Sequence, residues 1–273
     1  MKIWAVANQK GGVGKTTTAV TLAGQLAGEG RRTLLIDLDP HGSLTSYFGL
    51  DPDGIGASVY TLFKDRAERR PPSHYPDVLR PTGIERLTLL PASTALATLD
   101  RQLGAQDGMG LVLARTLTEL QPQFDHVLMD CPPMLGVLMV NALAACDRLL
   151  IPVQCEFLAL KGLERMLHTL TMISRARGGD VPRLIVPTMY DRRTRASGDA
   201  LQVLRERYGN AVWDAVIPVD TQFREASKAG QPLSVWQPRS RGTRAYAALL
   251  DHLLDRVPPL VDALQGHAGR VLA

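Results

Sequence analysis

The sequence predicts an α/β protein with a doubly wound, mostly parallel sheet flanked by helices, and three observations support this fold class. Short apolar runs alternate with amphipathic stretches along the 273 residues. Several of these runs are continuously apolar, as expected of strands that are covered on both faces. The first run leads through a glycine-rich loop into a stretch with helical periodicity, so strand, loop and helix follow in that order.

The predicted elements alternate in order along the chain. The run "KIWAVAN" (residues 2–8) is the first strand. The stretch after the loop places apolar residues on one face at helical spacing, namely Val20, Leu22, Ala23, Leu26 and Ala27. The further runs that we interpret as strands are residues 32–39, 87–92, 124–130, 148–153, 183–190 and 211–218.

We predict a single domain over residues 1–273. Residues 64–83 are rich in proline and charge and lack periodicity, so we interpret them as a surface excursion. We interpret residues 258–273 as a loose tail.

Composition indicates a globular protein of the cytoplasm. The chain is 45% hydrophobic and long enough to bury a sizeable core. Its three cysteines, Cys131, Cys146 and Cys155, lack metal-ligand spacing and cannot all pair within one chain, which favours reduced thiols. The N-terminus enters a strand without a signal-peptide pattern, and no apolar run approaches the length of a membrane span.

The stretch "NQKGGVGKTTT" (residues 8–18) joins the first strand to the first helix. In this setting, backbone N–H groups and the helix N-terminus can hold phosphate oxygens. Lys15 is placed to reach the β- and γ-phosphates of a nucleotide, and the Thr16 hydroxyl to ligate Mg²⁺ directly. The alternative is a glycine turn that carries two solvated lysines.

The loop departs from the common phosphate-loop pattern, which has a glycine where Gln9 stands. Its Lys-Gly-Gly-Val-Gly-Lys-Thr run instead resembles the deviant Walker A motif of the ParA/MinD family of ATPases, in its Soj-like ParA branch. The resemblance implies that ATP and Mg²⁺ are the cofactors. It also implies that Lys10 crosses a homodimer interface to the partner's nucleotide, so that Lys10 and Lys15 both serve catalysis. The nucleotide-binding set carried over is Lys10, Gly11, Gly12, Val13, Gly14, Lys15, Thr16 and Thr17.

Two carboxylates, Asp37 and Asp39, stand at alternate positions at the end of the second strand. Side chains two apart in an extended chain point the same way, so both should face the phosphate site, where such a pair can influence Mg²⁺ through water and orient an attacking water. The alternative is a turn-forming pair. The segment resembles the family's Asp-x-Asp-Pro-Gln-Gly switch, which implies that Asp39 is needed for hydrolysis. His41 stands where the family has glutamine.

A third carboxylate, Asp130, ends the strand "FDHVLMD". It is placed like a Walker B carboxylate, which holds Mg²⁺ through water. We interpret the neighbouring Cys131 as a packing residue and not as a nucleophile, because the sequence indicates no histidine that would pair with it. We interpret His126, at the start of the strand, as a surface residue.

Two late loops, residues 187–197 and 216–242, resemble the ParA loops that wrap the adenine. The base contacts implied by this resemblance are Thr188, Met189, Pro218 and Val219.

The same part of the chain suggests contact with nucleic acid. Residues 221–250 hold five basic residues and one acid, enough to account for the formal net charge of +4. The family's nonspecific DNA contact falls on Arg224, whereas Val219 replaces an arginine found in many members. The alternative to DNA binding is a solvated basic face with no ligand.

The resemblance covers nearly the whole chain and implies an ATP-dependent, dimerising ATPase that positions or segregates intracellular cargo. Hydrolysis is expected to be slow until a protein partner, ParB-like or linked to a chemotaxis array, stimulates it. The segments "DLDPHGSLTSYFG" and "IPVDTQFREAS" look closest to ParC-type proteins of chemotaxis operons, which position chemoreceptor arrays. Chromosome or plasmid partition is the other cargo we weigh.

Other function classes stay open at this point. The chain lacks a helix-turn-helix at its start and a strongly cationic amphipathic segment at its end, so we expect no membrane binding and a location on the nucleoid or at the cell pole. The alternatives are a MinD-like membrane-associated positioning ATPase, a metabolic enzyme that activates a small substrate with ATP, and a nonhydrolysing scaffold. Asp37, Asp39 and Asp130 together speak against the scaffold.

Overall fold

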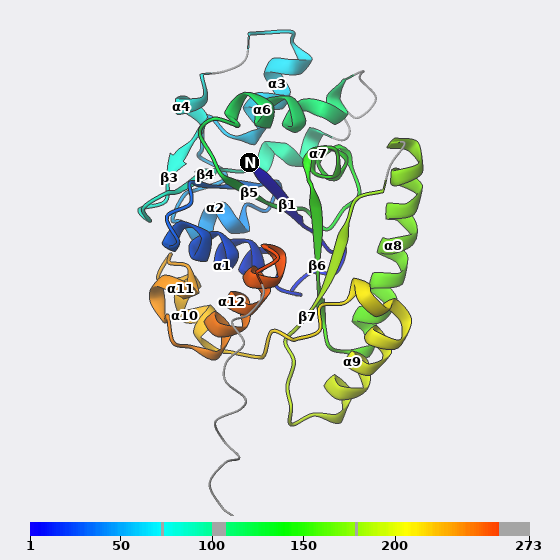
Figure 1. The fold of residues 1–273 in the computed structure, drawn as a ribbon. Helices are drawn as coiled ribbons and strands as arrows, with labels where there is room; N and C mark the ends of the chain where they lie inside the picture. The colour runs from blue at the N-terminus through cyan, green and yellow to red at the C-terminus, as the bar shows by residue number, and fades with distance from the viewer. Residues whose placement is uncertain (72–73, 100–107, 178–179, 257–273) are drawn as a thin grey trace, which may run out of the picture.

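A seven-stranded sheet forms the centre of the protein (Figure 1). The computed structural model describes residues 1–71, 74–99, 108–177 and 180–256. The strand order is β3-β4-β2-β5-β1-β6-β7, and every neighbouring pair is parallel except β3 with β4, so the predicted doubly wound, mostly parallel sheet is confirmed. The strands are β1 (Lys2–Val6), β2 (Thr33–Asp37), β3 (Arg80–Pro81), β4 (Leu87–Leu90), β5 (His126–Asp130), β6 (Arg148–Gln154) and β7 (Arg183–Thr188).

Helices connect the strands and lie on both sides of the sheet (Figure 1). The α-helices are α1 (Lys15–Gly28), α2 (Ser43–Tyr47), α3 (Val59–Ala67), α4 (Tyr75–Val78), α6 (Val112–Leu120), α7 (Val137–Ala145), α8 (Phe157–Arg177), α9 (Arg195–Tyr208), α10 (Gln222–Lys228), α11 (Leu233–Trp236) and α12 (Arg241–Leu253). The 3₁₀ helices are η1 (Thr94–Thr98), η2 (Met109–Leu111) and η3 (Gly209–Ala211). In the described residues, no helix combines the length and the apolar character needed to cross a bilayer.

Alternating side chains divide the core into two layers, one on each face of the sheet. Trp4 and Val6 of β1 pack with α1 and α12, whereas Ala5 packs on the opposite face with α3, α6, α7 and α8. Because both faces are covered, strand residues of either parity are apolar, which explains the continuous apolar runs in the sequence.

The helices α10, α11 and α12 form a unit that packs closely against α1. A Cβ at Gly24 of α1 would lie 2.3 Å from the Cβ of Pro232, at the start of α11. A Cβ at Gly242 of α12 would lie 2.6 Å from the ring of Phe223 in α10. Glycine is therefore required at both positions for this close approach, which places the C-terminal helices directly behind the helix that follows the glycine loop.

The prediction of a strand at residues 211–218 is wrong. Residues 211–218 form no strand in the structure; they make only isolated bridges, Ile185 with Val212 and Tyr190 with Pro218. The run is apolar because Trp213 and Ile217 are buried in the core beside α1 and α12, 2% and 3% exposed. A short apolar run records burial, and burial alone does not require strand pairing.

Residues 64–83, predicted to be a surface excursion, are mostly exposed or half-buried where the structure describes them, and the excursion stays a prediction. Their described part contains the end of α3, the short helix α4 and the edge strand β3, and Val78 is fully buried in the core. The single domain stays a prediction, and the predicted tail, residues 258–273, lies outside the described residues.

His126 is buried, contrary to the prediction of a surface residue. Its side chain is 3% exposed and stands edge-on to Trp4, with ring centroids 5.6 Å apart. Neither ring nitrogen has a hydrogen-bond partner within the described ranges. Burial lowers the pKa of His126 to about 4. A position at the start of a strand does not reveal this burial, because β5 is central and its first residue is already covered.

Acid should destabilise the fold through this histidine. An unfolded histidine has a pKa of about 6.5. Between about pH 6.5 and pH 4, His126 is therefore protonated in the unfolded state and neutral in the folded state. The free energy of unfolding should therefore decrease as the pH is lowered, and His126 should account for about 2 kcal/mol of this decrease at pH 5. Urea unfolding at pH 7.5 and pH 5 should show a smaller loss in His126→Phe than in the wild type. The exposed His168→Gln serves as control, and an equal loss in all three proteins would contradict the assignment.

Candidate nucleotide-binding site

The glycine loop lies between β1 and α1, at the carboxyl end of β1, which pairs with β5 on one side and β6 on the other. Gly12 and Gly14 have φ angles of 74° and 93°, in the left-handed region that favours glycine. A Cβ added at Gly11, Gly12 or Gly14 would meet no described atom within 4 Å. The loop therefore forms an open cradle beside the N-terminus of α1, as phosphate binding requires.

Lys15 and Thr16 begin α1, and their side chains reach the loop and the end of β5, respectively. Lys15 is 9% exposed, and its Nζ donates to the carbonyl of Lys10 at 3.3 Å. The Thr16 hydroxyl donates to Asp130 Oδ2 at 2.6 Å. The first turn of the helix thus joins the loop to the end of β5, which lies 114 residues further along the chain.

Asp37 and Asp130 end adjacent strands and face each other in register. Asp37 is fully buried and accepts hydrogen bonds from the Thr45 N–H at 2.8 Å and the Thr45 hydroxyl at 2.7 Å. Burial raises the pKa of both carboxyls, and the negative charge of Asp37 raises that of Asp130 further. Two carboxylates at neighbouring strand ends, with the Lys15 ammonium as a nearby positive charge, favour the binding of a further positive charge.

A cation would fit beside one carboxylate oxygen of Asp130. Its Oδ1 is buried and has no hydrogen-bond partner in the part of the chain that the structure describes. Among these residues, no group of three or more His, Cys, Asp or Glu side chains is arranged to hold a metal. Mg²⁺ prefers oxygen ligands, so the Thr16 hydroxyl and the two carboxylates fit a Mg²⁺ ion, which would take its other ligands from water and phosphate.

Asp39 lies two residues beyond the end of β2 and is not part of the strand. Its Oδ1 accepts from the His41 N–H at 3.0 Å and lies 2.8 Å from His41 Nδ1. The Asp39 side chain is 15% exposed, whereas that of His41 is 79% exposed. Asp39 therefore stands at the entrance of the site, and His41, in place of the family's glutamine, holds its carboxylate.

Lys10 contacts its own chain. Its Nζ makes an ion pair with Glu156 and lies 3.4 Å from Gln154 Oε1, at the junction of β6 and α8. Its backbone N–H donates to Asn8 Oδ1 at 2.9 Å. Sequence reasoning missed Gln154 and Glu156 because their relation to the loop depends on the pairing of β1 with β6. It also missed Asn8, whose amide side chain donates to the Pro152 carbonyl of β6 at 2.7 Å.

The loops predicted to wrap an adenine lie side by side. The Tyr190 N–H donates to the Ile217 carbonyl at 3.0 Å, and the Val219 N–H donates to the Tyr190 carbonyl at 3.1 Å. This pairing brings Met189, Pro218 and Val219 together, with Met189 and Val219 37% and 43% exposed.

Thr188 has a different position from these three residues. It is buried, and its hydroxyl donates to the Val13 carbonyl at 2.9 Å. Thr188 thus contacts the glycine loop itself, while Val13 is buried and Thr17 lies in the first turn of α1.

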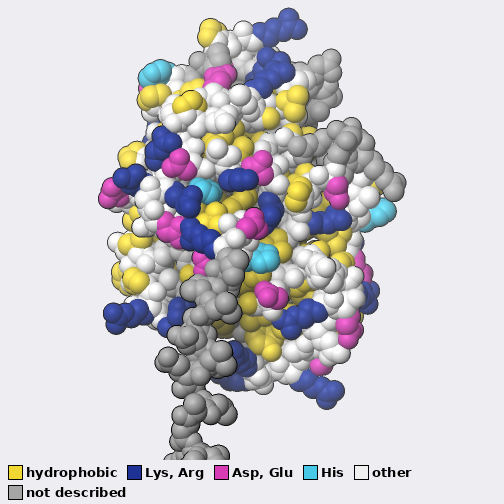
Figure 2. All heavy atoms as spheres, in the orientation of Figure 1, with side chains coloured by type: hydrophobic (Ala, Val, Ile, Leu, Met, Phe, Trp, Pro, Cys, Tyr) yellow, Lys and Arg dark blue, Asp and Glu magenta, His cyan; other side chains and the backbone are white. Residues whose placement is uncertain are grey.

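Arg224, the predicted DNA contact, is an exposed residue of α10. On the face of the molecule drawn in Figure 2, basic and acidic side chains are interspersed. The net charge therefore does not gather into one patch on that face, and the basic segment of α10–α12 carries the DNA prediction by itself.

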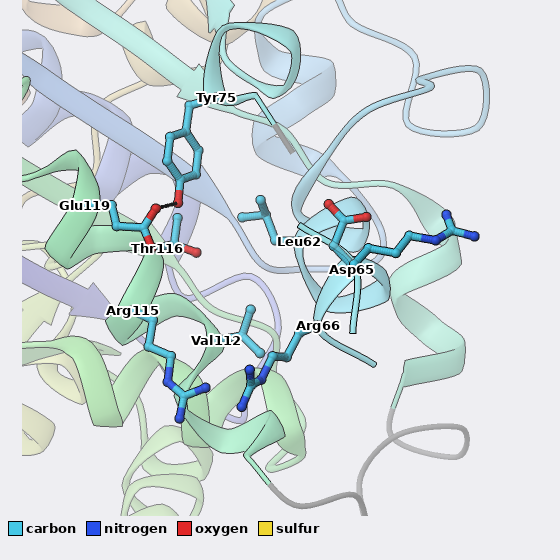
Figure 3. Close-up of a pocket in the computed structure, with 9 residues that line it drawn as sticks. Leu62, Asp65, Arg66, Tyr75, Val112, Arg115, Thr116 and Glu119 are labelled. Carbon is cyan, nitrogen blue, oxygen red and sulfur yellow. Dashed lines mark hydrogen bonds between the residues drawn. The ribbon is translucent and has the colours of Figure 1, made fainter. Parts of the chain in front are cut away.

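A cavity of about 200 Å³ opens between α3 and α6, away from the glycine loop. Its walls include Leu62 and Val112, and the Tyr75 hydroxyl donates to Glu119 at 2.6 Å across it (Figure 3). None of the residues predicted for the nucleotide site lines this cavity.

The Cys131 thiol, next to Asp130, is fully buried. Burial raises its pKa well above the ordinary value, so the thiol stays protonated and un-nucleophilic at neutral pH. This supports its interpretation as a packing residue.

Comparison with known proteins finds relatives that match most of the chain. A family model for the AAA domain matches residues 1–180. The chromosome partitioning protein ParA of Myxococcus xanthus is 36% identical, with 94% of this chain and 89% of the relative covered. The sporulation initiation inhibitor protein Soj of Bacillus subtilis is also 36% identical, with 91% and 96% covered.

Solved structures agree with these relatives. Cobyrinic acid a,c-diamide synthase from Mycobacterium smegmatis is 36% identical and superimposes with a TM-score of 0.78, covering 93% of this chain and 94% of that one. Its structures hold ADP or an ATP analogue together with magnesium, which are the cofactors predicted from the sequence. An ATP complex of a McdA variant from Cyanothece has a TM-score of 0.80 at 23% identity, with 96% and 98% covered, and shows the shared fold.

Proposed function

Because the chain belongs to the ParA/MinD family of P-loop ATPases, we propose that it is a Mg²⁺-dependent ATPase switch that positions intracellular cargo. The observation that carries this proposal is the convergence of Lys15, Thr16 and Asp130 at the glycine loop, with a buried carboxylate oxygen left unpartnered among the described residues beside them. Such an arrangement needs a phosphate and a divalent cation to complete it.

The chain's own groups divide the work of binding. The backbone of Gly11–Thr17 and the N-terminus of α1 hold phosphate oxygens, and Lys15 contributes a charge-assisted hydrogen bond to them. Mg²⁺, when bound, neutralises the charge of the β- and γ-phosphates and of the leaving group. Met189, Pro218 and Val219 form the wall for the base, since backbone hydrogen bonds pair the two loops that carry them and Met189 and Val219 are exposed.

In our proposal Asp39 orients the water that attacks the γ-phosphate. It is the carboxylate of the three that stands at the entrance, and the hydrogen bonds from His41 fix its direction. Asp37 and Asp130, which are buried, would hold the cation through its bound water. Hydrolysis then removes the γ-phosphate on which the ATP-bound dimer depends.

Two molecules of ATP bring two copies of the chain together. The surface around the loop supports this proposal, because large apolar side chains stand exposed on both sides of β1: Met134 after β5, and Phe157 and Leu158 at the start of α8 are 69–74% exposed. An exposed apolar surface around a charged site favours a protein partner. Lys10 leaves Glu156 and contacts the phosphates of the partner subunit's nucleotide.

The proposal also concerns the kind of cargo that the ATPase positions. The names of the curated relatives from Myxococcus xanthus and Caulobacter vibrioides refer to chromosome partitioning, which favours a DNA-linked role with Arg224 as a nonspecific DNA contact. The chemoreceptor-array role rests on the two ParC-like segments. The two roles differ in whether the ATP-bound dimer needs DNA, and a ParB-like or array-linked protein would stimulate hydrolysis in each.

DNA binding and sedimentation should be measured without nucleotide, with ADP and with a nonhydrolysable ATP analogue, over a salt series. We expect a dimer and DNA binding with the analogue alone, and a binding constant that falls with salt because phosphate contacts release counterions. Arg224→Ala should weaken DNA binding, with Arg115→Ala on α6, also an exposed arginine, as a control that removes the same charge elsewhere. A dimer that binds no DNA in any state would transfer the cargo assignment to a protein-anchored array. Monomers in every state would contradict the switch.

A metabolic enzyme is the second candidate, because one of the 36% identical structures is a diamide synthase. Such an enzyme uses ATP to activate a carboxylate of a small substrate for attack by an amine. Its ATP turnover would depend on that substrate and an amine donor, whereas the switch should respond to a protein or to DNA. ATP turnover stimulated by a small carboxylic acid plus glutamine would favour the enzyme.

A further inference from the structure

Tyr246 of α12 contacts the helix that follows the glycine loop. Its ring is 1% exposed, and its hydroxyl lies 2.8 Å from the hydroxyl of Thr18. Thr18 is in the first turn of α1, and both its hydroxyl and its N–H reach the carbonyl of Gly14, at 2.7 Å and 2.9 Å. Neither Tyr246 nor Thr18 belongs to the residues that the sequence assigned to nucleotide binding.

The direction of these hydrogen bonds is fixed by proton count. A threonine hydroxyl has one proton, and that of Thr18 is donated to the Gly14 carbonyl. The Tyr246 hydroxyl must therefore donate to Thr18, which gives a single chain from Tyr246 through Thr18 to Gly14. Donation from Tyr246 makes the Thr18 hydroxyl a better donor in turn, because linked hydrogen bonds polarise one another.

The end of this chain sets the orientation of a peptide group in the phosphate cradle. The carbonyl of Gly14 and the N–H of Lys15 belong to one planar trans peptide, so they point in opposite directions. Holding the carbonyl toward Thr18 turns the Lys15 N–H outward from the helix N-terminus, the direction from which a phosphate oxygen is bound. Gly14, at φ 93°, has no side chain that would fix this peptide otherwise.

The position of Tyr246 depends in turn on α10 and α11. Phe223 of α10 stands edge-on to the Tyr246 ring, with centroids 5.7 Å apart and planes at 89°. Phe223 is next to Arg224 in the chain, and its ring fills the space that glycine leaves at Gly242. The same helices therefore hold the predicted DNA contact on their outer side and the hydroxyl that reaches the glycine loop on their inner side.

We propose that Tyr246 is a positioning residue for the nucleotide, which holds the Gly14–Lys15 peptide in its phosphate-binding orientation through Thr18. This inference rests on the proposed function in one respect, that the loop binds ATP. In this proposal, the Lys15 N–H contacts phosphate equally in the ground state and in the transition state. Loss of its orientation therefore weakens binding without slowing the chemical step.

Tyr246→Phe keeps the ring and removes the donor. We expect the KM for ATP and the Kd for ADP to rise about five- to tenfold, as for loss of one buried hydrogen bond, with kcat unchanged. Thr18→Val carries the same test without altering α12 and should raise both constants at least as much. In the double variant, Tyr246→Phe should add nothing to Thr18→Val, because the tyrosine acts only through that hydroxyl.

Tyr47→Phe is the matched control. It removes a tyrosine hydroxyl that donates to the Gln231 carbonyl at 2.7 Å, beside the same helices but not to the loop. A purely structural role of Tyr246 would lower the unfolding midpoint as Tyr47→Phe does and leave KM unchanged. Wild-type affinity in Tyr246→Phe, or additive effects in the double variant, would overturn the inference alone. A wild-type protein that binds neither ATP nor ADP would overturn the proposed function itself.

Discussion

Asp39→Ala should lower the rate of ATP hydrolysis at least about 100-fold while leaving the affinity for ATP within about threefold of the wild type. The Asp39 carboxylate accepts hydrogen bonds from its own turn, through the His41 N–H and ring. The hydrogen bonds of Lys15, Thr16 and Asp130, the residues that we propose hold the nucleotide and the cation, do not involve Asp39 and are kept in the variant. Phosphate release and equilibrium binding of the ATP analogue measure the two quantities.

The same variant should change the oligomeric state. If hydrolysis is the step that dissolves the dimer, Asp39→Ala should accumulate as a dimer with ATP itself, whereas the wild type needs a nonhydrolysable analogue. Asp53→Ala, an exposed aspartate in the following turn, is the control and should hydrolyse ATP at the wild-type rate. Undiminished hydrolysis in Asp39→Ala would exclude this residue as the one that orients the water.

The parts of the site that the sequence predicted are those in which a short segment contains its own geometry. A strand, three glycines and the start of a helix, close together in the chain, determine the cradle at Gly12 and Gly14 and the beginning of α1 at Lys15. The carboxylates at the ends of β2 and β5 follow from the parallel sheet, because all such strands end at one edge. The register that sets Asp37 opposite Asp130 could not be predicted, since it depends on pairing between distant segments.

What the sequence missed lies across long distances in the chain. Lys10 pairs with a glutamate 146 residues later, and Thr18 with a tyrosine 228 residues later. Residues 211–218 and His126 were misjudged for a related reason. Local patterns report how apolar a segment is, but burial next to Trp4 or beneath α12 is decided by packing.

Lys10→Ala should abolish ATP-dependent dimerisation while leaving nucleotide binding to the monomer largely intact. In the structure the Lys10 ammonium pairs with Glu156 and Gln154, on the far side of the loop from Thr16 and Asp130. Removal of this side chain therefore leaves the chain's own cradle and Lys15 in place. The affinity for the ATP analogue, measured at a protein concentration at which the wild type is monomeric, should change by less than about threefold.

Dimerisation should respond far more strongly. A symmetric dimer would contain the Lys10 contact twice. A hydrogen bond to a charged group contributes about 1.5–3 kcal/mol, so the loss of both predicts dimer dissociation constants raised by about 100-fold or more. The intrachain pair with Glu156 is a weak competitor, because both side chains are partly exposed, 30% and 38%, and such pairs contribute at most about 1 kcal/mol.

Glu156→Gln is the matched variant that separates the two roles of the lysine. It removes the ion pair within the chain but keeps the ammonium, so the dimer should form with equal or slightly higher affinity. Sedimentation of the wild type, Lys10→Ala and Glu156→Gln with the ATP analogue decides the matter. If Lys10→Ala dimerised with wild-type affinity, the lysine would act only within its own chain. If Glu156→Gln lost dimerisation as Lys10→Ala does, the ion pair, and not a contact across the interface, would be the feature that dimerisation requires.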